Sequence, residues 1–118
     1  MSTAFDSDCI FCRIVSGDLP SFKVYESDRV VAFRDIQPAA PVHVLVVPRQ
    51  HIASIHELAK VDADMSHELM VSIGEIALSE QLIEDGYRVV TNTGAWGGQT
   101  VGHLHFHILG GRQLGTMG

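Results

Sequence analysis

Three histidines near the carboxyl end of the chain alternate with apolar residues, in the run HLHFHIL that spans His103–Leu109. In a β-strand, side chains two residues apart point to the same face. We therefore expect His103, His105 and His107 to share one face, with their apolar neighbours on the other. Three explanations fit such a row of imidazoles: a coincidence on a solvent-facing strand, a tridentate metal site of the kind that zinc uses, or catalysis at phosphorus. We favour catalysis at phosphorus.

Phosphoryl or nucleotidyl transfer needs a nucleophile that is unprotonated near neutral pH, and imidazole, with a pKa of about 6.5, meets this need. The reaction also needs hydrogen-bond donors at the oxygens of the phosphorus centre in its transition state. One histidine of the row can attack while its neighbours donate. A backbone carbonyl that accepts from Nδ1–H of the attacking ring would leave the lone pair on the other ring nitrogen.

A loop rich in glycine and small polar residues, NTGAWGGQTVG at 92–102, directly precedes these histidines. Its backbone N–H groups can approach a phosphate closely, because glycine has no side chain to block the approach. The loop lacks the lysine of a GxxxxGK[ST] loop, and we expect no helix to follow it, so it is not a P-loop. A glycine loop alone is often only a turn, and the adjacent histidines make it a candidate phosphate site.

The two cysteines of the chain form a Cys9-x-x-Cys12 pair near its start. Such a pair is half of a zinc site, a redox pair, or two ordinary buried thiols. A redox pair of the thioredoxin kind belongs at a helix start in a βαβ setting, which this sequence does not provide. Zinc requires two further ligands, and the chain has no second cysteine pair.

The sequence pattern of the strands and helices that must position the histidines and cysteines predicts an α+β domain with an antiparallel sheet. Five runs rich in β-branched or otherwise apolar residues indicate strands at 22–26, 30–34, 42–47, 87–92 and 103–109. Apolar residues at three- and four-residue steps predict a helix from Asp62, or Asp64 as an alternative cap, to about Ile83, with Gly86 just past its end. Residues 52–59 favour a short helical segment. We expect the long helix on one sheet face, and a partner or a ligand on the other.

Composition places the chain among globular proteins and excludes several classes of function. The 118 residues are 46% hydrophobic and 19% charged, which suits one domain, predicted at 9–118 after a loose arm at 1–8. A net charge of −6 argues against a general nucleic-acid binder. No apolar run approaches the roughly 20 residues of a membrane span, and the acidic start is not a secretory signal. With few cysteines, we expect a reducing cytoplasm.

These motifs resemble the histidine-triad family, whose signature alternates histidines with apolar residues as His103–Leu109 does. The resemblance extends over nearly the whole chain, through the segments Ile10-Phe11, 32–38, 42–48, 86–88 and the Gly-Gly-Gln before the triad. The tail Gly-Gly-Arg-Gln at 110–113 is most similar to the Hint branch, the histidine-triad nucleotide-binding proteins. The resemblance implies a five-stranded antiparallel sheet with one long and one short helix. It also implies a homodimer, paired through the long helices into a continuous sheet.

The same resemblance implies a role for each residue of a nucleotide site. His105 corresponds to the nucleophile, His107 and His43 to residues that contact the phosphate oxygens, and Thr100 to a hydroxyl near the leaving group. The implied nucleotide contacts are Asp35 with the ribose hydroxyls, an apolar slot for the purine (Phe11, Ile14, Phe33, Ile36), and phosphate and sugar contacts (Asn92, Gly98, Gln99). The alternatives are purely structural roles: a hydrogen-bonded core histidine at 43, a turn-forming aspartate at 35, and packing in the hydrophobic core for the apolar residues.

Members that carry the cysteine pair hold structural zinc, which by resemblance implies Cys9, Cys12, His51 and His103 as its ligands. We expect His56 and His67 to be solvated helix residues. One departure concerns the tail: the Hint branch carries a tryptophan there, whereas this chain ends in LGTMG at 114–118. The preference for the leaving group is therefore open.

The function that the resemblance implies is a purine nucleoside phosphoramidase, which releases AMP from adenosine 5′-phosphoramidates through a nucleotidyl-His105 intermediate. Two alternatives stay open. One is hydrolysis of dinucleoside polyphosphates or nucleotidyl conjugates, and the other is a nucleotide-binding regulatory module whose hydrolysis is incidental. The triad serves all three, so the sequence does not separate them.

Overall fold

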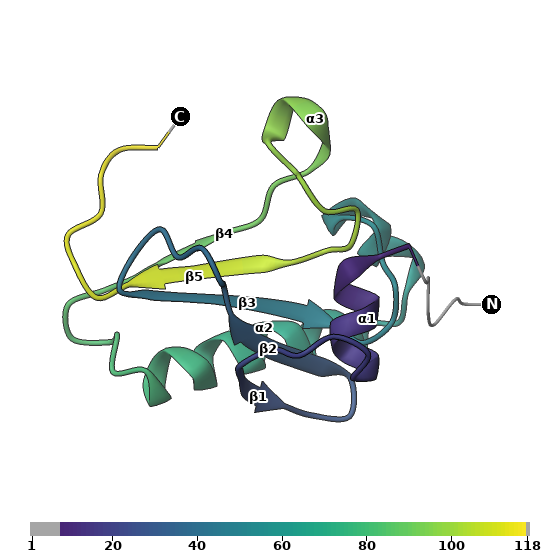
Figure 1. Cartoon of the computed structure of the whole chain (residues 1–118), viewed down its shortest axis with the longest axis horizontal. Coiled ribbons are helices and arrows are strands. Elements are labelled where there is room, and N and C mark those ends of the chain that lie inside the picture. Colours follow the sequence, from purple (N-terminus) through teal and green to yellow (C-terminus); the bar gives the residue numbers. More distant parts are fainter. Residues whose placement is uncertain (1–7, 118) are drawn as a thin grey trace.

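The computed structural model describes residues 8–117, which form a five-stranded sheet with helices on both of its faces (Figure 1). The elements in chain order are α1 (Ile10–Ser16), β1 (Lys23–Glu26), β2 (Val30–Arg34), β3 (Val42–Pro48), the 3₁₀ helix η1 (Ile55–Lys60), α2 (Ala63–Ser79), β4 (Arg88–Val90), α3 (Gly94–Gly97) and β5 (Phe106–Gly110). The predicted arm at 1–8 lies outside the described residues, apart from Asp8. None of the helices within residues 8–117 combines the length and the apolar character that crossing a membrane requires.

The strands follow the order β1-β2-β3-β5-β4. All neighbours are antiparallel, and this pairing was predicted. β3 is almost entirely buried, which explains its near-continuous apolar sequence. Three strands are shorter than predicted: β1 begins at Lys23 instead of Phe22, β4 covers only Arg88–Val90, and β5 begins at Phe106 instead of His103. Before Phe106 the chain leaves the ladder, because the N–H of Leu104 donates to the carbonyl of Ile52, beyond the end of β3 (2.6 Å).

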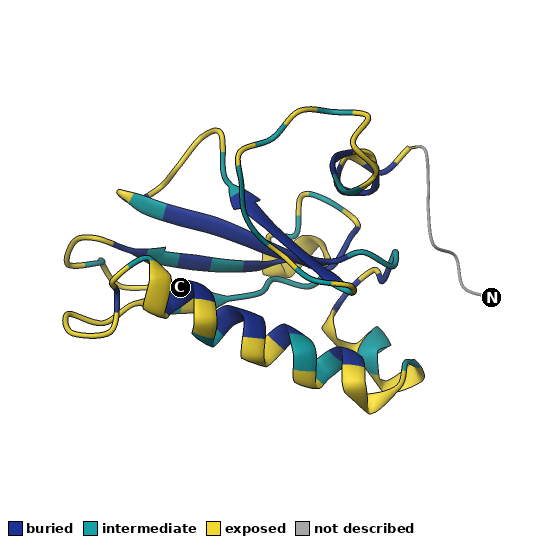
Figure 2. Ribbon diagram, turned by 90° about the horizontal axis from the view of Figure 1, so that it is seen from below, coloured by how far each residue is buried: buried dark blue, intermediate teal, exposed yellow. Residues whose placement is uncertain are grey.

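The long helix α2 covers one face of the sheet, and its buried residues point toward the strands (Figure 2). Asp62 caps the helix, as predicted, by accepting a hydrogen bond from the N–H of Met65 (3.1 Å). Helix and sheet share one apolar core, whose members include Met65, Leu69, Ile73, Ile76, Val44, Val46, Leu104, Phe106 and Ile108. The apolar partners of the three histidines therefore face α2.

The end of α2 differs from the prediction, because the helix stops at Ser79 rather than near Ile83. Gln81 adopts a left-handed backbone (φ 61°), and the N–H of Leu82 returns to the carbonyl of Ala77 (3.0 Å). This is a Schellman motif, in which glycine normally takes the left-handed position. Leu82, the residue after it, is buried in the core beside α2. The packing of Leu82 thus decides the helix end, and Gly86 lies beyond it.

The opposite face of the sheet is covered in part by the chain itself, and the expectation of a partner or a ligand on this face stays a prediction. The short helix α1 lies on this face, on the other side of the sheet from α2 (Figures 1 and 2). Residues of α1 and inward-facing residues of the strands form a second apolar cluster, with Cys9, Phe11, Cys12, Ile14, Val31, Phe33, Leu45 and Val47 as members.

Two further short segments complete the fold. The helical segment predicted at 52–59 is the 3₁₀ helix η1, and the glycine loop contains the four-residue helix α3, which the sequence did not predict. His56 and His67 are exposed on η1 and α2, as expected.

Candidate active site and metal cluster

The histidines predicted to act together come from the adjacent strands β3 and β5 and from the residues just before β5. In the register of this pair, Leu45 lies opposite His107, and His43 lies opposite Leu109. His43 and His107 are therefore diagonal neighbours on the face that carries α1. The predicted alternation is confirmed, because His105 packs against Phe11 of α1 while Leu104 and Phe106 enter the core on the α2 side.

His105 is held in one tautomer by the backbone. Its Nδ1–H donates to the carbonyl oxygen of His103 (2.8 Å), so the lone pair lies on Nε2. The ring is buried, 5% exposed, with its neighbours Phe11 and His107 each at a centroid distance of 5.0 Å. The hydroxyl of Thr91 donates to the carbonyl oxygen of His105 (2.8 Å) and fixes the backbone at this residue. This arrangement is the one that a nitrogen nucleophile requires.

His43 and His107 form a relay whose direction is set by a backbone amide. The N–H of Ala39 donates to Nδ1 of His43 (3.0 Å), so a neutral His43 carries its proton on Nε2. Nε2–H then donates to Nδ1 of His107 (2.9 Å). The proton of His107 must consequently lie on Nε2, the nitrogen that the relay leaves available to a ligand. His43 is therefore a buried histidine with both ring nitrogens hydrogen-bonded, one to the backbone of Ala39 and the other to His107 of the triad.

Burial keeps both rings of the relay neutral. Desolvation, helped by the nearby His105 and His43, lowers the pKa of His107 to about 4. Desolvation also lowers the pKa of His43, against the opposing effect of Asp35, whose Oδ2 lies 3.5 Å from Nε2 of His43. Oδ1 of Asp35 accepts the N–H of Gln37 (2.8 Å), so this carboxylate shapes a turn and also stands beside the relay.

Cys9, Cys12, His51 and His103 bring their ligand atoms within 4.8 Å of one another, close enough to bind one metal ion. Nδ1 of His103 lies 3.3 Å from Sγ of Cys9 and 3.5 Å from Sγ of Cys12, and Nδ1 of His51 lies 3.2 Å from Sγ of Cys12. A zinc tetrahedron with Zn–S near 2.3 Å and Zn–N near 2.0–2.1 Å has S···N edges of about 3.5 Å. The four side chains therefore fit such an ion.

The protonation of His103 also suits metal binding. Its Nε2–H donates to the carbonyl oxygen of Pro48 (2.9 Å), which leaves the lone pair of Nδ1 toward the two sulfurs. Burial lowers the pKa of His103 to about 4, so the ring is neutral. A second group of residues, Asp35, His43 and His107, is equally compact but does not fit a cation. The amide of Ala39 occupies Nδ1 of His43, so Nε2 retains its proton and has no lone pair to give.

The residues predicted to line a purine slot are only partly together. Phe11, Ile14 and Phe33 lie in the second apolar cluster, with the rings of Phe11 and Phe33 5.5 Å apart in an edge contact. Ile36 is 92% exposed and lies outside this cluster. Thr100 lines a cavity of about 320 Å³ together with Cys9 and His51, so it stands beside the metal cluster.

The glycine loop is braced by one of its own side chains. Nε2 of Gln99 donates to the carbonyls of Ala53 and Val101, and Oε1 accepts the N–H of Gly94. Gln99 thus holds the loop closed. Gly98 takes a left-handed conformation (φ 85°) at the end of α3, and Asn92 is half-buried after β4.

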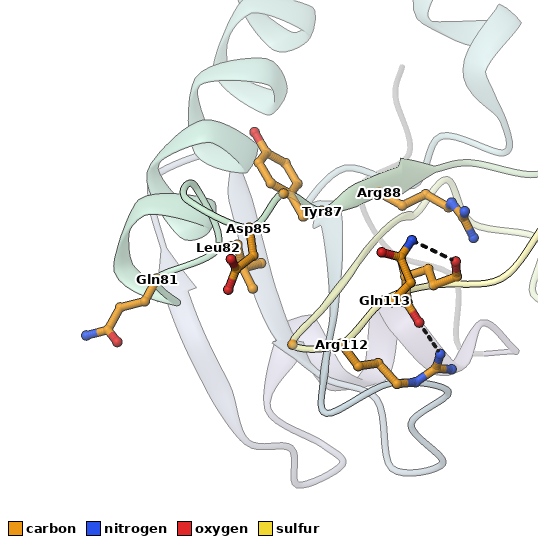
Figure 3. Close-up of a pocket in the computed structure, with 10 residues that line it drawn as sticks. Gln81, Leu82, Asp85, Tyr87, Arg88, Arg112 and Gln113 are labelled. Atoms are coloured by element: carbon orange, nitrogen blue, oxygen red, sulfur yellow. Dashed lines mark hydrogen bonds between the residues drawn. The ribbon is translucent and has the colours of Figure 1, made fainter.

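A larger cavity of about 460 Å³ lies beyond the end of α2, between residues 81–88 and residues 111–114, and its lining includes no histidine (Figure 3). Its arginines are engaged with the backbone: Arg112 donates to the carbonyls of Gln113 and Ala39, and Arg88 to that of Gly115.

Sequence reasoning missed three groups that orient the histidines: the N–H of Ala39, the carbonyl of Pro48 and the hydroxyl of Thr91. The first two are backbone groups, which no side-chain pattern reveals. Thr91 follows the short strand β4, and only the spatial pairing with β5 brings it to His105.

Comparison with known proteins agrees with this geometry. Residues 16–114 match the HIT domain. The purine nucleoside phosphoramidase of Escherichia coli is 41% identical over 110 residues, which cover 93% of this chain and 92% of that protein. A histidine triad protein from Clostridium difficile has a TM-score of 0.89 and 45% identity, over 96% of this chain and 98% of that one. A HIT family hydrolase from Legionella pneumophila has a TM-score of 0.85 and 43% identity, over 89% and 94%. The chain belongs to the HIT, or histidine triad, family.

Proposed function

We propose that the protein is a nucleotide hydrolase that cleaves the P–N bond of purine nucleoside 5′-phosphoramidates and releases AMP from the adenosine compounds. The observation that carries this proposal is the fixed tautomer of His105, with Nδ1–H bound to the His103 carbonyl and a lone pair on Nε2. The identity to the phosphoramidase of E. coli over most of both chains supports the same substrate class.

The reaction runs in two displacements at phosphorus. Nε2 of His105 attacks the α-phosphorus, the P–N bond breaks, and the amine leaves with a proton taken up from a neighbouring donor or from water. Water then attacks the nucleotidyl-histidine, releases the nucleoside monophosphate and restores the neutral ring. Nε2–H of His107, directed by His43, donates to a phosphate oxygen in both steps, where negative charge develops.

The remaining predicted residues bind the nucleotide. The carboxylate of Asp35 accepts hydrogen bonds from the ribose hydroxyls, and the hydroxyl of Thr100 lies near the leaving group. The purine lies against an apolar slot of Phe11, Ile14 and Phe33, with the exposed Ile36 as a further contact. The loop contacts phosphate and sugar through Asn92, Gly98 and Gln99, and the amide of Gln99 also braces the loop. The contact of Phe11 with both Phe33 and His105 supports a slot beside the nucleophile.

We further propose that the four-residue metal cluster holds zinc. Cys9, Cys12, His51 and His103 would hold the ion through two thiolates and two neutral imidazoles. Four such ligands would leave no open position for water, so the ion would stabilise the fold. Reduced thiols suit a cytoplasmic protein. A homodimer is supported by the open edge of β4 and by exposed apolar side chains on and around α2 and β4, namely Met70, Val71, Leu78, Ile83, Tyr87 and Val89.

The test replaces the nucleophile and retains the binding groups. His105→Asn should abolish turnover of an adenosine 5′-phosphoramidate, while AMP still binds within a few-fold of the wild-type Kd. Rapidly quenched wild-type protein should show a nucleotidyl adduct on His105 by mass spectrometry. His67→Asn, on the exposed surface of α2, is the matched control. Wild-type kcat in His105→Asn would refute the assignment, and faster turnover of a diadenosine polyphosphate than of the phosphoramidate would replace the substrate class.

A further inference from the structure

His103 takes part in both sites of the molecule. Its side chain is completely buried, and both ring nitrogens are engaged: Nδ1 with the thiols of Cys9 and Cys12, and Nε2 with the carbonyl of Pro48. Its own backbone carbonyl accepts the Nδ1–H of His105. A single residue thus connects the metal cluster with the nucleophile.

We propose that His103 is a positioning residue through which the metal ion sets the tautomer and the orientation of His105. This inference rests on the proposed nucleophile and the proposed metal cluster, and goes beyond both. It assigns the ion a part in the rate of the reaction, exerted through one carbonyl group, besides a part in stability.

The local backbone explains why this carbonyl needs such support. β5 begins at Phe106, so the peptide group that serves His105 lies outside the sheet ladder. The N–H of Leu104 and the carbonyl of His103 belong to the same planar peptide group, and this N–H donates to the carbonyl of Ile52, the residue that follows His51 of the metal cluster. One end of the peptide group is therefore held beside His51, and the other end is the Cα of His103. A side chain held at both ring nitrogens fixes its Cα, so the ring of His103 and the bond to Ile52 together hold the direction of the carbonyl between them. Without the ion, the Nδ1 anchor consists only of contacts with thiols, which are weak hydrogen-bonding groups.

The two cysteines of the cluster also act on the ring of His105, through Phe11. Cys9 caps α1 through its sulfur, which accepts the N–H of Cys12 (3.2 Å), and Phe11 lies between the two cysteines. The ring of Phe11 contacts those of His103 and His105 at centroid distances of 6.1 and 5.0 Å. A helix of seven residues is too short to be stable alone, so ligation of its two cysteines would hold Phe11 against the nucleophile.

The experiment removes the ion without altering either His103 or His105. Wild type, Cys12→Ser and His51→Asn are compared with His56→Asn, which changes an exposed histidine on η1 outside the cluster. Each full-length protein is measured with and without added zinc for metal content, Tm, kcat and KM on an adenosine 5′-phosphoramidate. The ¹⁵N NMR spectrum of the histidines at neutral pH, recorded well below each Tm, reports the tautomer of every ring.

We expect one zinc per chain in wild type and in His56→Asn, and none in the two ligand variants. Loss of zinc should lower kcat about tenfold, the equivalent of one hydrogen bond, and convert part of the His105 signal from the Nδ1–H to the Nε2–H tautomer. Returning zinc to chelated wild type should restore kcat and the Nδ1–H tautomer of His105 together. A purely structural ion would lower Tm and leave the tautomer of the folded protein unchanged, and this outcome would overturn the inference while the proposed function stands. Wild type that takes up no zinc would overturn the metal cluster and the inference together, whereas the His105→Asn test would be unaffected.

Discussion

The relay between His43 and His107 predicts a specific loss of stability in acid. His107 accepts the Nε2–H of His43 at Nδ1, and its pKa is lowered to about 4 from the usual 6.5. A proton added to Nδ1 of His107 would place two N–H groups opposite each other, and the relay would break. The perturbation is His107→Asn, which removes the titrating ring and retains a polar side chain.

The sign follows from the lowered pKa. Between about pH 6.5 and pH 4 the unfolded chain binds a proton at His107 that the folded protein does not, so the free energy of unfolding falls as the pH falls. The contribution is complete above pH 6.5 and is lost as the pH drops toward 4. A difference of about 2.5 pKa units corresponds to roughly 3 kcal/mol at 1.36 kcal/mol per unit.

Urea unfolding at pH 7, 6, 5 and 4 measures this contribution. Wild type should lose about 3 kcal/mol more of its unfolding free energy between pH 7 and pH 4 than His107→Asn does. Release of a metal ion in acid affects both proteins alike and cancels in the difference. His67→Asn, an exposed control, should follow wild type at every pH. Parallel curves for wild type and His107→Asn would refute the argument that burial keeps this ring neutral.

Three other predictions concern separate parts of the molecule. Asp35→Ala should weaken AMP binding by about 1–3 kcal/mol but hardly affect a 2′,3′-dideoxy analogue in calorimetry; equal losses would limit Asp35 to its turn. Gln81→Gly should raise the free energy of unfolding by about 0.5–1 kcal/mol in urea, because glycine adopts the left-handed conformation at this position without strain. Gln81→Ala, the control, should not. Chelation should lower the Tm of wild type and speed amide exchange in α1, with no such change in Cys9→Ser; identical responses would argue against a metal at these thiols.

Much of the fold was predictable from local patterns. The strands carry β-branched and aromatic runs, and Asp62 has the side chain that an N-cap requires. The end of α2 was not predictable, because it depends on Gln81 accepting a left-handed conformation so that Leu82 can enter the core. The same holds for the start of β5, which is set by a hydrogen bond to Ile52, about fifty residues away in sequence.

The candidate site was predictable in its chemistry and less so in its geometry. The spacing of the triad correctly predicted that its histidines share one face of the sheet. The four metal ligands implied by the resemblance lie close enough together in the structure to bind one ion. The directions of the protons could not be read from side chains, because the amide of Ala39 and the carbonyl of Pro48 decide them. Gln99, expected at the nucleotide, has its amide engaged in bracing the loop.

The diagonal pairing of His43 with His107 has a consequence for how the sheet assembles. β3 is apolar on both faces, so burial alone would tolerate a shift of one residue against β5. Such a shift would turn His107 to the opposite face and bury an imidazole among aliphatic side chains without a partner. Gly110 imposes a second condition, since any side chain there would meet Leu82 at 2.7 Å. The pair that we propose to contact the phosphate oxygens therefore also specifies the register of two strands, and turnover would report that the sheet has formed in that register.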